Sequence, residues 1–262
     1  MTDKISGIAF QDNGVLSGTP VVFIHGFPFT RAMWEPQEKA FAKRRLVTYD
    51  LRGLGASETG DGQYTVEQHV DDLLAVMDGL KIPRAVLCGL SMGGYIALRA
   101  AERAPERAAG LVLCDTKSEA DGNEAKVKRA AGIRAVKKDG AAKYADEFVK
   151  AVLCENTFKT KPDLVERVKG LIRGNTPLGI AGNLLALAAR TDTTTGLSKM
   201  TMPALILVGQ EDKLTPPGAS EAMQKFLPDA SMHVVPDAGH LSNLENSAVF
   251  NAKLEAFLGS VP

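Results

Sequence analysis

A serine between two glycines is the first residue in this sequence whose setting indicates chemistry. The stretch from Arg84 to Gly94 reads RAVLCGLSMGG, so a short apolar run leads into the pentapeptide GLSMG and then a helix-like segment. A strand, a tight turn and a helix are the setting in which G-x-S-x-G holds a nucleophilic serine at a sharp bend. Glycine is favoured on both sides because a Cβ atom would crowd that bend. We therefore predict that Ser91 is a nucleophile, with an ordinary strand-to-helix loop as the alternative.

A serine hydroxyl is a weak nucleophile unless a base takes its proton, and four histidines are available. His69 stands in a polar stretch of a predicted helix and is expected at the surface. His233 alternates within a predicted strand, where packing or an edge position is expected. His25 ends a strand near the site but comes too early in the chain order. His240 lies in a loop just past the last predicted strand, and we predict that it is the base for Ser91.

The base needs a carboxylate that fixes its tautomer and stabilises its charged form. Asp212 follows the apolar run ALILV by a short loop, with room for one helix and one strand before His240. The order serine, aspartate, histidine favours Asp212 as that carboxylate. Asp115 is the main rival because it also ends a strand, beside the strand that leads to the serine. Asp237 is expected to structure its own loop, and Glu211 to point elsewhere.

Acyl transfer also requires donors for a developing oxyanion. The backbone N–H of Met92, directly after the serine, is one candidate at the start of a helix. The loop HGFP at residues 25–28 follows the first core strand and offers the second. The N–H of Phe27 is the better donor there, because Pro28 has none, and Gly26 allows a close backbone approach.

Several further residues have two interpretations each. Trp34 follows the oxyanion loop with Phe27 and Phe29, and it either lines an apolar substrate pocket or packs in the core beneath that loop. Arg52 is expected in a structural salt bridge rather than in a substrate contact.

A cluster of basic residues is expected to form a solvated helix face, with attraction of acidic substrates as the alternative. The cluster comprises Lys126, Lys128, Arg129, Arg134, Lys137 and Lys138.

The elements that must position these residues alternate between strands and helices. Strands are predicted at 21–24, 46–49, 85–88, 110–114, 204–208 and 232–235. Thr65 with Gln68 has the spacing of a capping box, Thr215 with Pro216 resembles a helix start, and Asn246 or Ser247 can cap the final helix. This alternation predicts an α/β fold with a mostly parallel, doubly wound sheet.

The strand pattern is interrupted between residues 116 and 195. Helical segments are predicted there near 124–138, 141–153, 162–172 and 180–190. The predicted organisation is a core of residues 1–115 and 196–262 with a helical cap of residues 116–195. Because the insertion follows the carboxyl end of a strand, where open α/β sheets bind ligands, we expect it to cover the site. A helical decoration remote from the chemistry is the alternative.

Composition limits the class of protein. The 262 residues contain 31 Lys and Arg against 31 Asp and Glu, which gives no support for a nucleic-acid partner. No apolar run is long enough for a membrane span, and the N-terminus lacks the apolar region of a signal peptide. Three cysteines without metal-ligand spacing predict no metal site, and Cys88 and Cys114 are expected as buried free thiols. A cytoplasmic protein without a cofactor is expected. The oligomeric state stays open.

Taken together, these segments resemble the α/β-hydrolase fold superfamily over nearly the whole chain. The resemblance is carried by HGFP at 25–28, DLRGLGAS at 50–57, GLSMGG at 89–94, GQED at 209–212 and DAGH at 237–240. The stretch from Cys88 to Thr116 is similar to the carboxylesterase and 3-oxoadipate enol-lactonase branch. Ser91 departs from the dehalogenase and epoxide-hydrolase branches, which have aspartate at that position.

The resemblance implies hydrolysis of a small-molecule ester or lactone through an acyl-serine. It also implies Phe27 and Met92 as oxyanion donors and a helical cap that shapes the acyl and alcohol pockets. Two alternatives keep the same fold. One is cofactor-free perhydrolysis of the haloperoxidase type, in which hydrogen peroxide replaces water on the acyl-enzyme. The other is a signalling receptor that keeps the triad but turns over very slowly.

Overall fold

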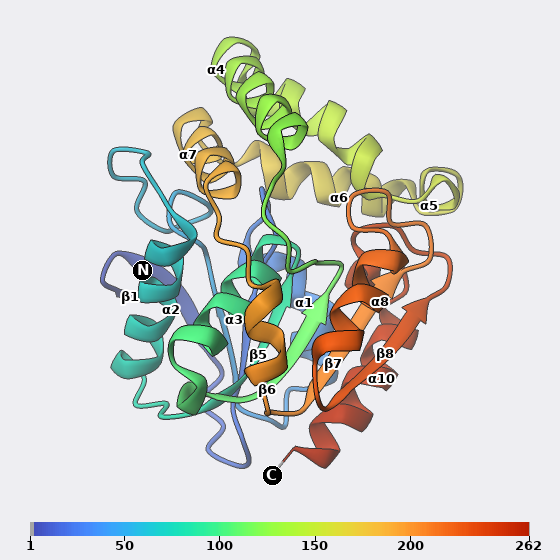
Figure 1. Cartoon of the computed structure of the whole chain (residues 1–262). Coiled ribbons are helices and arrows are strands. Elements are labelled where there is room, and N and C mark those ends of the chain that lie inside the picture. Colours follow the sequence, from blue (N-terminus) through green and yellow to red (C-terminus); the bar gives the residue numbers. More distant parts are fainter. Residues whose placement is uncertain (1–2, 262) are drawn as a thin grey trace.

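Within residues 3–261, which the computed structural model describes, eight strands form one sheet in the order β1-β2-β4-β3-β5-β6-β7-β8 (Figure 1). The strands from β4 to β8 along this order are parallel, and β1 and β2 extend the sheet by antiparallel pairing. The strands are β1 (Lys4–Ile5), β2 (Ile8–Asp12), β3 (Val21–Ile24), β4 (Leu46–Tyr49), β5 (Ala85–Leu90), β6 (Ala108–Cys114), β7 (Ala204–Gly209) and β8 (Ala230–Val235).

The central strands are apolar along their whole length because helices cover both faces of the sheet. Every residue of β3, β5, β6 and β7 is buried, as expected for parallel strands inside an α/β fold. The predicted fold class is confirmed, and the predicted bounds of β3 and β4 match. The strands β1 and β2 were not predicted. They lie at an edge and are only partly buried, so they lack the continuous apolar run that marks the central strands.

Helices of the core pack on the two faces of this sheet. On one face α1 contacts α10, and on the other α2, α3, η3 and α8 follow one another (Figure 1). The core helices are α1 (Glu35–Ala40), α2 (Val66–Gly79), α3 (Met92–Arg103), α8 (Pro217–Phe226), α9 (Ser242–Glu245) and α10 (Ser247–Ser260), with 3-10 turns η1 (Arg31–Trp34), η2 (Pro105–Arg107) and η3 (Thr194–Lys199).

Two predicted helix caps are confirmed and one is wrong. The Thr65 side chain accepts a hydrogen bond from the Gln68 N–H at the start of α2, and Asn246 accepts one from the Val249 N–H at the start of α10. The prediction of Thr215 as a helix cap is wrong, because α8 begins two residues later and Pro216 is the residue that precedes it. The hydroxyl of Thr215 instead serves the site described below.

The segment 116–195, called the helical insertion from here on, contains α4 (Asn123–Val152), α5 (Glu155–Thr160), α6 (Pro162–Arg173) and α7 (Pro177–Ala188). It lies above the end of the sheet to which the arrow of β6 points (Figure 1). A kink at Gly140, whose φ is 82°, divides α4 into two arms, which correspond to two of the predicted helices. The short α5 was not predicted. Helix α7 packs closely on the core: a Cβ atom on Gly179 would lie 1.8 Å from the carbonyl oxygen of Gly53.

Candidate active site

Ser91 occupies a strained turn between β5 and α3. Its φ of 54° and ψ of −113° are unusual for a residue with a side chain, and strain of this kind is concentrated at functional sites. Glycine is required on both sides: a Cβ atom on Gly89 would lie 2.2 Å from the Gly93 carbonyl oxygen, and one on Gly93 would lie 2.1 Å from that of Ile24. The hydroxyl of Thr116 donates to the main-chain oxygen of Ser91 at 2.8 Å. The turn is therefore closely packed and held by a hydrogen bond from Thr116.

His240 and Asp212 meet Ser91 at the carboxyl ends of the parallel strands. The Ser91 Oγ lies 2.8 Å from His240 Nε2, and the other ring nitrogen, Nδ1, lies 2.8 Å from Asp212 Oδ2. These three residues follow β5, β8 and β7, which end at the same edge of the sheet. The structure thus brings together the three residues that the sequence singled out. A serine hydroxyl, an imidazole within hydrogen-bond reach of it and a carboxylate on the other ring nitrogen are the groups that nucleophilic catalysis by serine requires.

The Asp212 carboxylate is fixed by the turn that follows it. Its Oδ1 accepts from the main-chain N–H groups of Leu214 at 2.8 Å and Thr215 at 3.0 Å, and its Oδ2 accepts from the Thr215 hydroxyl at 2.7 Å. The Thr215 hydroxyl also lies 3.3 Å from His240 Nδ1. Sequence reasoning missed this role, because a threonine before proline is also the pattern of a helix start.

Burial and charge act in opposite directions on this pair. Burial by itself lowers the pKa of His240, but the charge and hydrogen bond of Asp212, together with the charges of Asp115 and Glu245, outweigh it, so the pKa lies above its ordinary value. Burial raises the pKa of Asp212, but the attraction of His240 and the hydrogen bonds from Thr215 hold it below the ordinary value. The site therefore favours a charged carboxylate beside a histidine that is stabilised when it carries a proton.

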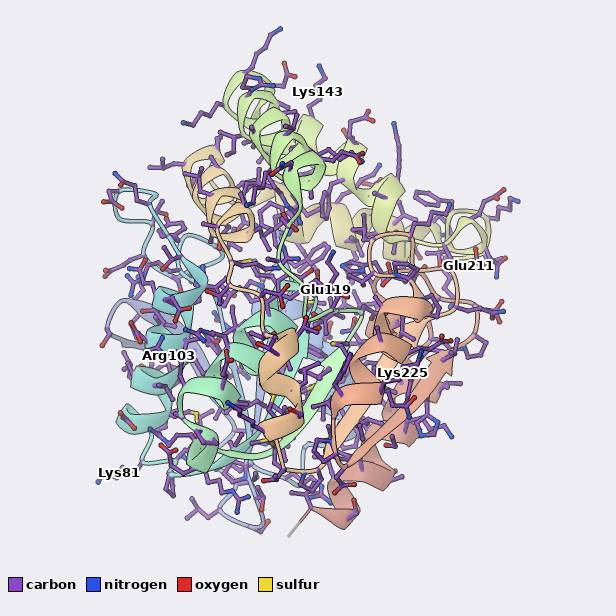
Figure 2. All side chains as sticks on the ribbon, viewed as in Figure 1. Lys81, Arg103, Glu119, Lys143, Glu211 and Lys225 are labelled. Atoms are coloured by element: carbon purple, nitrogen blue, oxygen red, sulfur yellow. The ribbon has the colours of Figure 1, made fainter. Side chains whose placement is uncertain are left out.

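The rival carboxylates do not contact His240. Asp115 accepts from the Gly209 N–H at 2.7 Å and from the Ser242 hydroxyl at 2.6 Å, so it links the end of β6 to the end of β7 and the start of α9. Burial, followed by repulsion from Asp212, raises the pKa of Asp115 well above its ordinary value. Glu211 is exposed and lies at the periphery of the core in Figure 2, so it points elsewhere, as expected.

The two predicted N–H donors, Met92 and Phe27, belong to segments next to Ser91. Met92 is the first residue of α3, so its N–H has no partner within the helix. Phe27 lies in the loop after β3 and lines the same cavity as Ser91. The buried ring of His25 holds this loop, since Nε2 accepts from the Leu51 N–H at 2.9 Å and Nδ1 lies 2.9 Å from the Gly26 carbonyl oxygen. A neutral ring that donates through Nδ1 satisfies both bonds, and burial lowers the pKa of His25.

A cavity of about 370 Å³ opens onto Ser91 and His240. The helical insertion supplies Tyr144 and Phe148, two half-buried aromatic residues that sequence reasoning missed, and their rings stack with centroids 5.6 Å apart. Trp34 does not line this cavity. It is fully buried between Phe23 and Phe250, with ring centroids at 4.9 and 6.3 Å, so the pocket prediction is wrong and the core interpretation holds. Trp34 is the last residue of η1, and its side chain is buried in the core.

Four cationic side chains line the cavity. Lys128 and Arg129 belong to the predicted basic cluster, whereas Lys117 and Lys213 were not predicted to lie there. Arg129 pairs with Asp121 at 3.0 Å and Lys128 with Glu124 at 2.7 Å. Within residues 3–261, neither Lys117 nor Lys213 forms an ion pair. The rest of the predicted basic cluster, Lys126, Arg134, Lys137 and Lys138, is exposed on α4, as a solvated face requires.

Other predictions fall outside the site. Arg52 forms the expected salt bridge, with Asp72, and Cys88 and Cys114 are buried free thiols. The surface prediction for His69 is wrong, because its ring is fully buried. Within the described part of the chain no group of three or more His, Cys, Asp or Glu side chains could hold a metal ion. None of the helices between residues 3 and 261 has the length and apolar character needed to cross a membrane.

Comparison with known proteins gives consistent results. A family model described as alpha/beta hydrolase fold matches residues 19–247. A thermophilic esterase from Thermogutta terrifontis, solved with malate bound, is 36% identical and superposes with a TM-score of 0.94 over 100% of this chain and 99% of its own. The 3-oxoadipate enol-lactonase 2 of Acinetobacter baylyi is 28% identical over 91% of this chain and 88% of its own. A putative non-heme bromoperoxidase of Mycobacterium tuberculosis is 30% identical over 97% of this chain and 98% of its own length.

Proposed function

We propose that this chain, which belongs to the α/β-hydrolase fold family, is a serine hydrolase that cleaves small carboxylic esters or lactones. One observation carries the proposal: the unbroken line of hydrogen bonds from Ser91 Oγ through His240 to Asp212, both at 2.8 Å, beneath a cavity of about 370 Å³. The similarity to an esterase and to an enol-lactonase supports the same class of substrate.

In the first half-reaction Ser91 Oγ attacks the substrate carbonyl carbon while His240 Nε2 takes the hydroxyl proton. The carbonyl oxygen becomes an oxyanion, which the N–H groups of Phe27 and Met92 stabilise in our proposal. Asp212 stabilises the resulting imidazolium without taking its proton. His240 then protonates the leaving alkoxide or enolate, the carbon–oxygen bond breaks, and an acyl-serine remains.

In the second half-reaction water attacks the acyl-serine, and His240 acts again as the base. The tetrahedral intermediate collapses, Ser91 recovers its proton from His240, and the carboxylic acid is released. In a lactone the leaving oxygen stays attached to the acyl group, so a single ring-opened acid is the product. No step of this mechanism calls on a cofactor.

The helical insertion is proposed as a cap over the site. Its residues Tyr144 and Phe148 form one wall of the cavity, together with Leu184 and Leu187 of α7. The proposed division is therefore a hydrolase core of residues 1–115 and 196–262 and a cap of residues 116–195. Pocket walls of this kind select the acyl and alcohol groups, whereas the core supplies the reaction.

A second candidate is perhydrolysis, favoured by the similarity to a putative non-heme bromoperoxidase. Hydrogen peroxide would replace water in the second half-reaction and release a peracid from the same acyl-serine. Peracid formation measured beside ester hydrolysis at equal acyl donor separates the two activities. A peracid rate far below the hydrolysis rate at millimolar peroxide would exclude this candidate as the main function.

The test of the proposal is the variant Ser91→Ala against Ser231→Ala, a matched control at an exposed serine of β8. We expect Ser91→Ala to lose turnover of p-nitrophenyl esters by a factor on the order of 10⁴ or more, with an unchanged circular dichroism spectrum. Ser231→Ala should keep wild-type turnover. Ester turnover that survives in folded Ser91→Ala would remove the serine mechanism.

A further inference from the structure

The loop that carries His240 is attached to the helical insertion as well as to the core. The His240 N–H donates to the carbonyl oxygen of Val152 at 2.8 Å, where α4 ends. Gly239 packs so closely on the same segment that a Cβ atom would lie 2.8 Å from the main-chain nitrogen of Cys154. The Cys154 Sγ also lies 3.6 Å from the Asp237 carbonyl oxygen. The His240 loop is therefore held by residues 152–154 through a hydrogen bond and close packing.

Glu245 bridges these two segments with a buried carboxylate. Its side chain extends from α9, and the residue is only 1% exposed. Oε1 accepts from the Gly239 N–H at 2.7 Å. Oε2 accepts from the Cys154 N–H at 2.8 Å and from the Thr157 hydroxyl at 2.7 Å. One oxygen thus holds the residue before the base, and the other holds the start of α5.

The donors around this side chain match a carboxylate that carries a charge. Two backbone N–H groups and one hydroxyl converge on the two oxygens, and an ionised carboxylate accepts at both. Lys161 donates to the main-chain oxygen of Glu245, and within residues 3–261 no cation forms an ion pair with its carboxylate. No ion pair within residues 3–261 therefore neutralises this charge. Among three negative charges that raise the pKa of His240, it contributes least, after those of Asp212 and Asp115.

We infer that Glu245 is a positioning residue that couples the helical insertion to the base of the reaction; this inference rests on the proposed function. The carboxylate sets the position of His240 through Gly239 and supports its protonated form through space. It fixes residues 152–157 to the same point. The insertion is consequently anchored at the α4–α5 junction beside the base, and a substrate that displaces this junction would also displace His240.

The variant Glu245→Gln tests this inference. Glutamine has nearly the same shape but only one acceptor oxygen, so it cannot serve Gly239 and Cys154 together. We expect kcat to fall by up to about 100-fold, as misplacement of a reacting group does, with a smaller change in KM. The acid limb of the kcat/KM profile should move to lower pH, because a negative charge near His240 is removed. Thr157→Val is the matched control: it removes one donor but keeps the charge, so its acid limb should stay at the wild-type pH.

A lower melting temperature with wild-type kcat and an unmoved acid limb would overturn the inference, because it would leave Glu245 a purely structural role. Glu245→Asp covers the case in which the glutamine variant does not fold. Aspartate keeps the charge but is too short to reach both segments, so kcat should fall while the acid limb stays in place. Wild-type kcat in this variant would equally contradict positioning.

Two parallel measurements separate this inference from the proposed function. Ser91→Ala, assayed beside the Glu245 variants, shows whether turnover depends on the serine at all. The His240 ring titration, followed by NMR in wild type and Glu245→Gln, requires no turnover and should move to lower pH in the variant. Turnover that persists in Ser91→Ala removes the proposed function, whereas an unchanged ring titration removes the electrostatic part of the coupling.

Discussion

The strand-end loops of the core and the helical insertion differ in how their side chains are held. In the core, Ser91, Asp212 and His240 are buried or half-buried. The Ser91 N–H donates to β6, the Asp212 carboxylate accepts from N–H groups of its own turn, and the His240 N–H donates to the last residue of α4. In the insertion, α4 carries ion pairs that are largely exposed, such as Lys128 with Glu124, where both side chains are at least 75% exposed. Exposed pairs of this kind contribute little to stability.

This difference suits a division of roles between the reaction and the choice of substrate. In the proposed function the core supplies the reacting groups, whereas the insertion contributes cavity walls, such as Tyr144 and Phe148, that select the substrate. Glu245 is the point at which the two regions meet, because its carboxylate holds the loop of the base and the start of α5 at once. Substitutions of Ser91, Asp212 or His240 should therefore abolish turnover, and substitutions in the cavity wall of the insertion should alter substrate preference.

The largest expected effect distinguishes the two aspartates at the ends of β6 and β7. Asp212→Asn should lower kcat by a factor on the order of 10⁴, because the amide favours the wrong histidine tautomer. Asp115→Asn should cost less than about tenfold in kcat, because Asp115 bonds Gly209 and Ser242 rather than His240. Steady-state kinetics with one ester checks both variants. A larger loss in Asp115→Asn, with its fold intact, would reverse the assignment.

The next effect concerns the stability of the core in acid. Burial lowers the pKa of His69 to about 3, whereas an unfolded histidine titrates near 6.5, so protonation favours the unfolded state as pH falls from about 6.5 to 3. The linkage amounts to about 3 kcal/mol of lost stability at pH 4. His69→Gln should therefore flatten the pH dependence of unfolding measured by urea titration. His233→Gln, at a partly exposed strand position, is the control and should leave the slope nearly unchanged.

A smaller effect is expected from the aromatic wall of the insertion. Phe148 packs edge-on against Phe27 with ring centroids 5.8 Å apart, so Phe148→Ala enlarges the cavity beside the oxyanion loop. The ratio of kcat/KM for an octanoate over an acetate ester should rise about tenfold. Phe158→Ala, at an exposed phenylalanine of α5 that does not line the cavity, should leave the ratio unchanged. If the ratio is unchanged in both variants, Phe148 does not determine which acyl chain length the protein prefers.

The smallest effect is electrostatic. Lys117 and Lys213 line the cavity without an ion pair in the described chain, so they should attract an ester whose acyl group ends in a carboxylate. Lys213→Ala should lower kcat/KM for a succinate monoester, relative to a butyrate ester, by up to about fivefold, and added salt should remove the difference. Lys225→Ala, on α8 and not among the residues that line the cavity, is the control. Equal losses for the two esters would argue against this role.

The meeting of Ser91, His240 and Asp212 could be predicted from the sequence because each residue follows a recognisable strand by a short offset. Glycine spacing identified the turn at Ser91, and the loops after β7 and β8 placed Asp212 and His240 at the same edge of the sheet. Thr215 was missed because its hydroxyl serves a side chain rather than a helix start. His69 was misplaced because polar neighbours surround it, although its spacing of three and four residues from Val66 and Leu73 lies on the buried stripe of α2.

The insertion was less predictable for a physical reason. Helical periodicity located most of its helices, but the kink at Gly140 sets the direction of the arm that carries Tyr144 and Phe148. Which face of that arm meets the cavity depends on contacts with Phe27 and α7, which are distant in sequence. The contacts of Glu245 also depend on residues distant in sequence, because its partners Cys154 and Thr157 lie about ninety residues earlier.

The central claim is an acyl group on Ser91 during turnover. Wild-type protein mixed with a slowly hydrolysed ester, quenched in acid at short times and digested for mass spectrometry, measures this intermediate directly. We predict that the acyl mass appears on the peptide containing Ser91 at least as fast as turnover, and that it is absent from Ser91→Ala. An acyl group on another residue, or turnover without any acylated Ser91 at the earliest times, would contradict it.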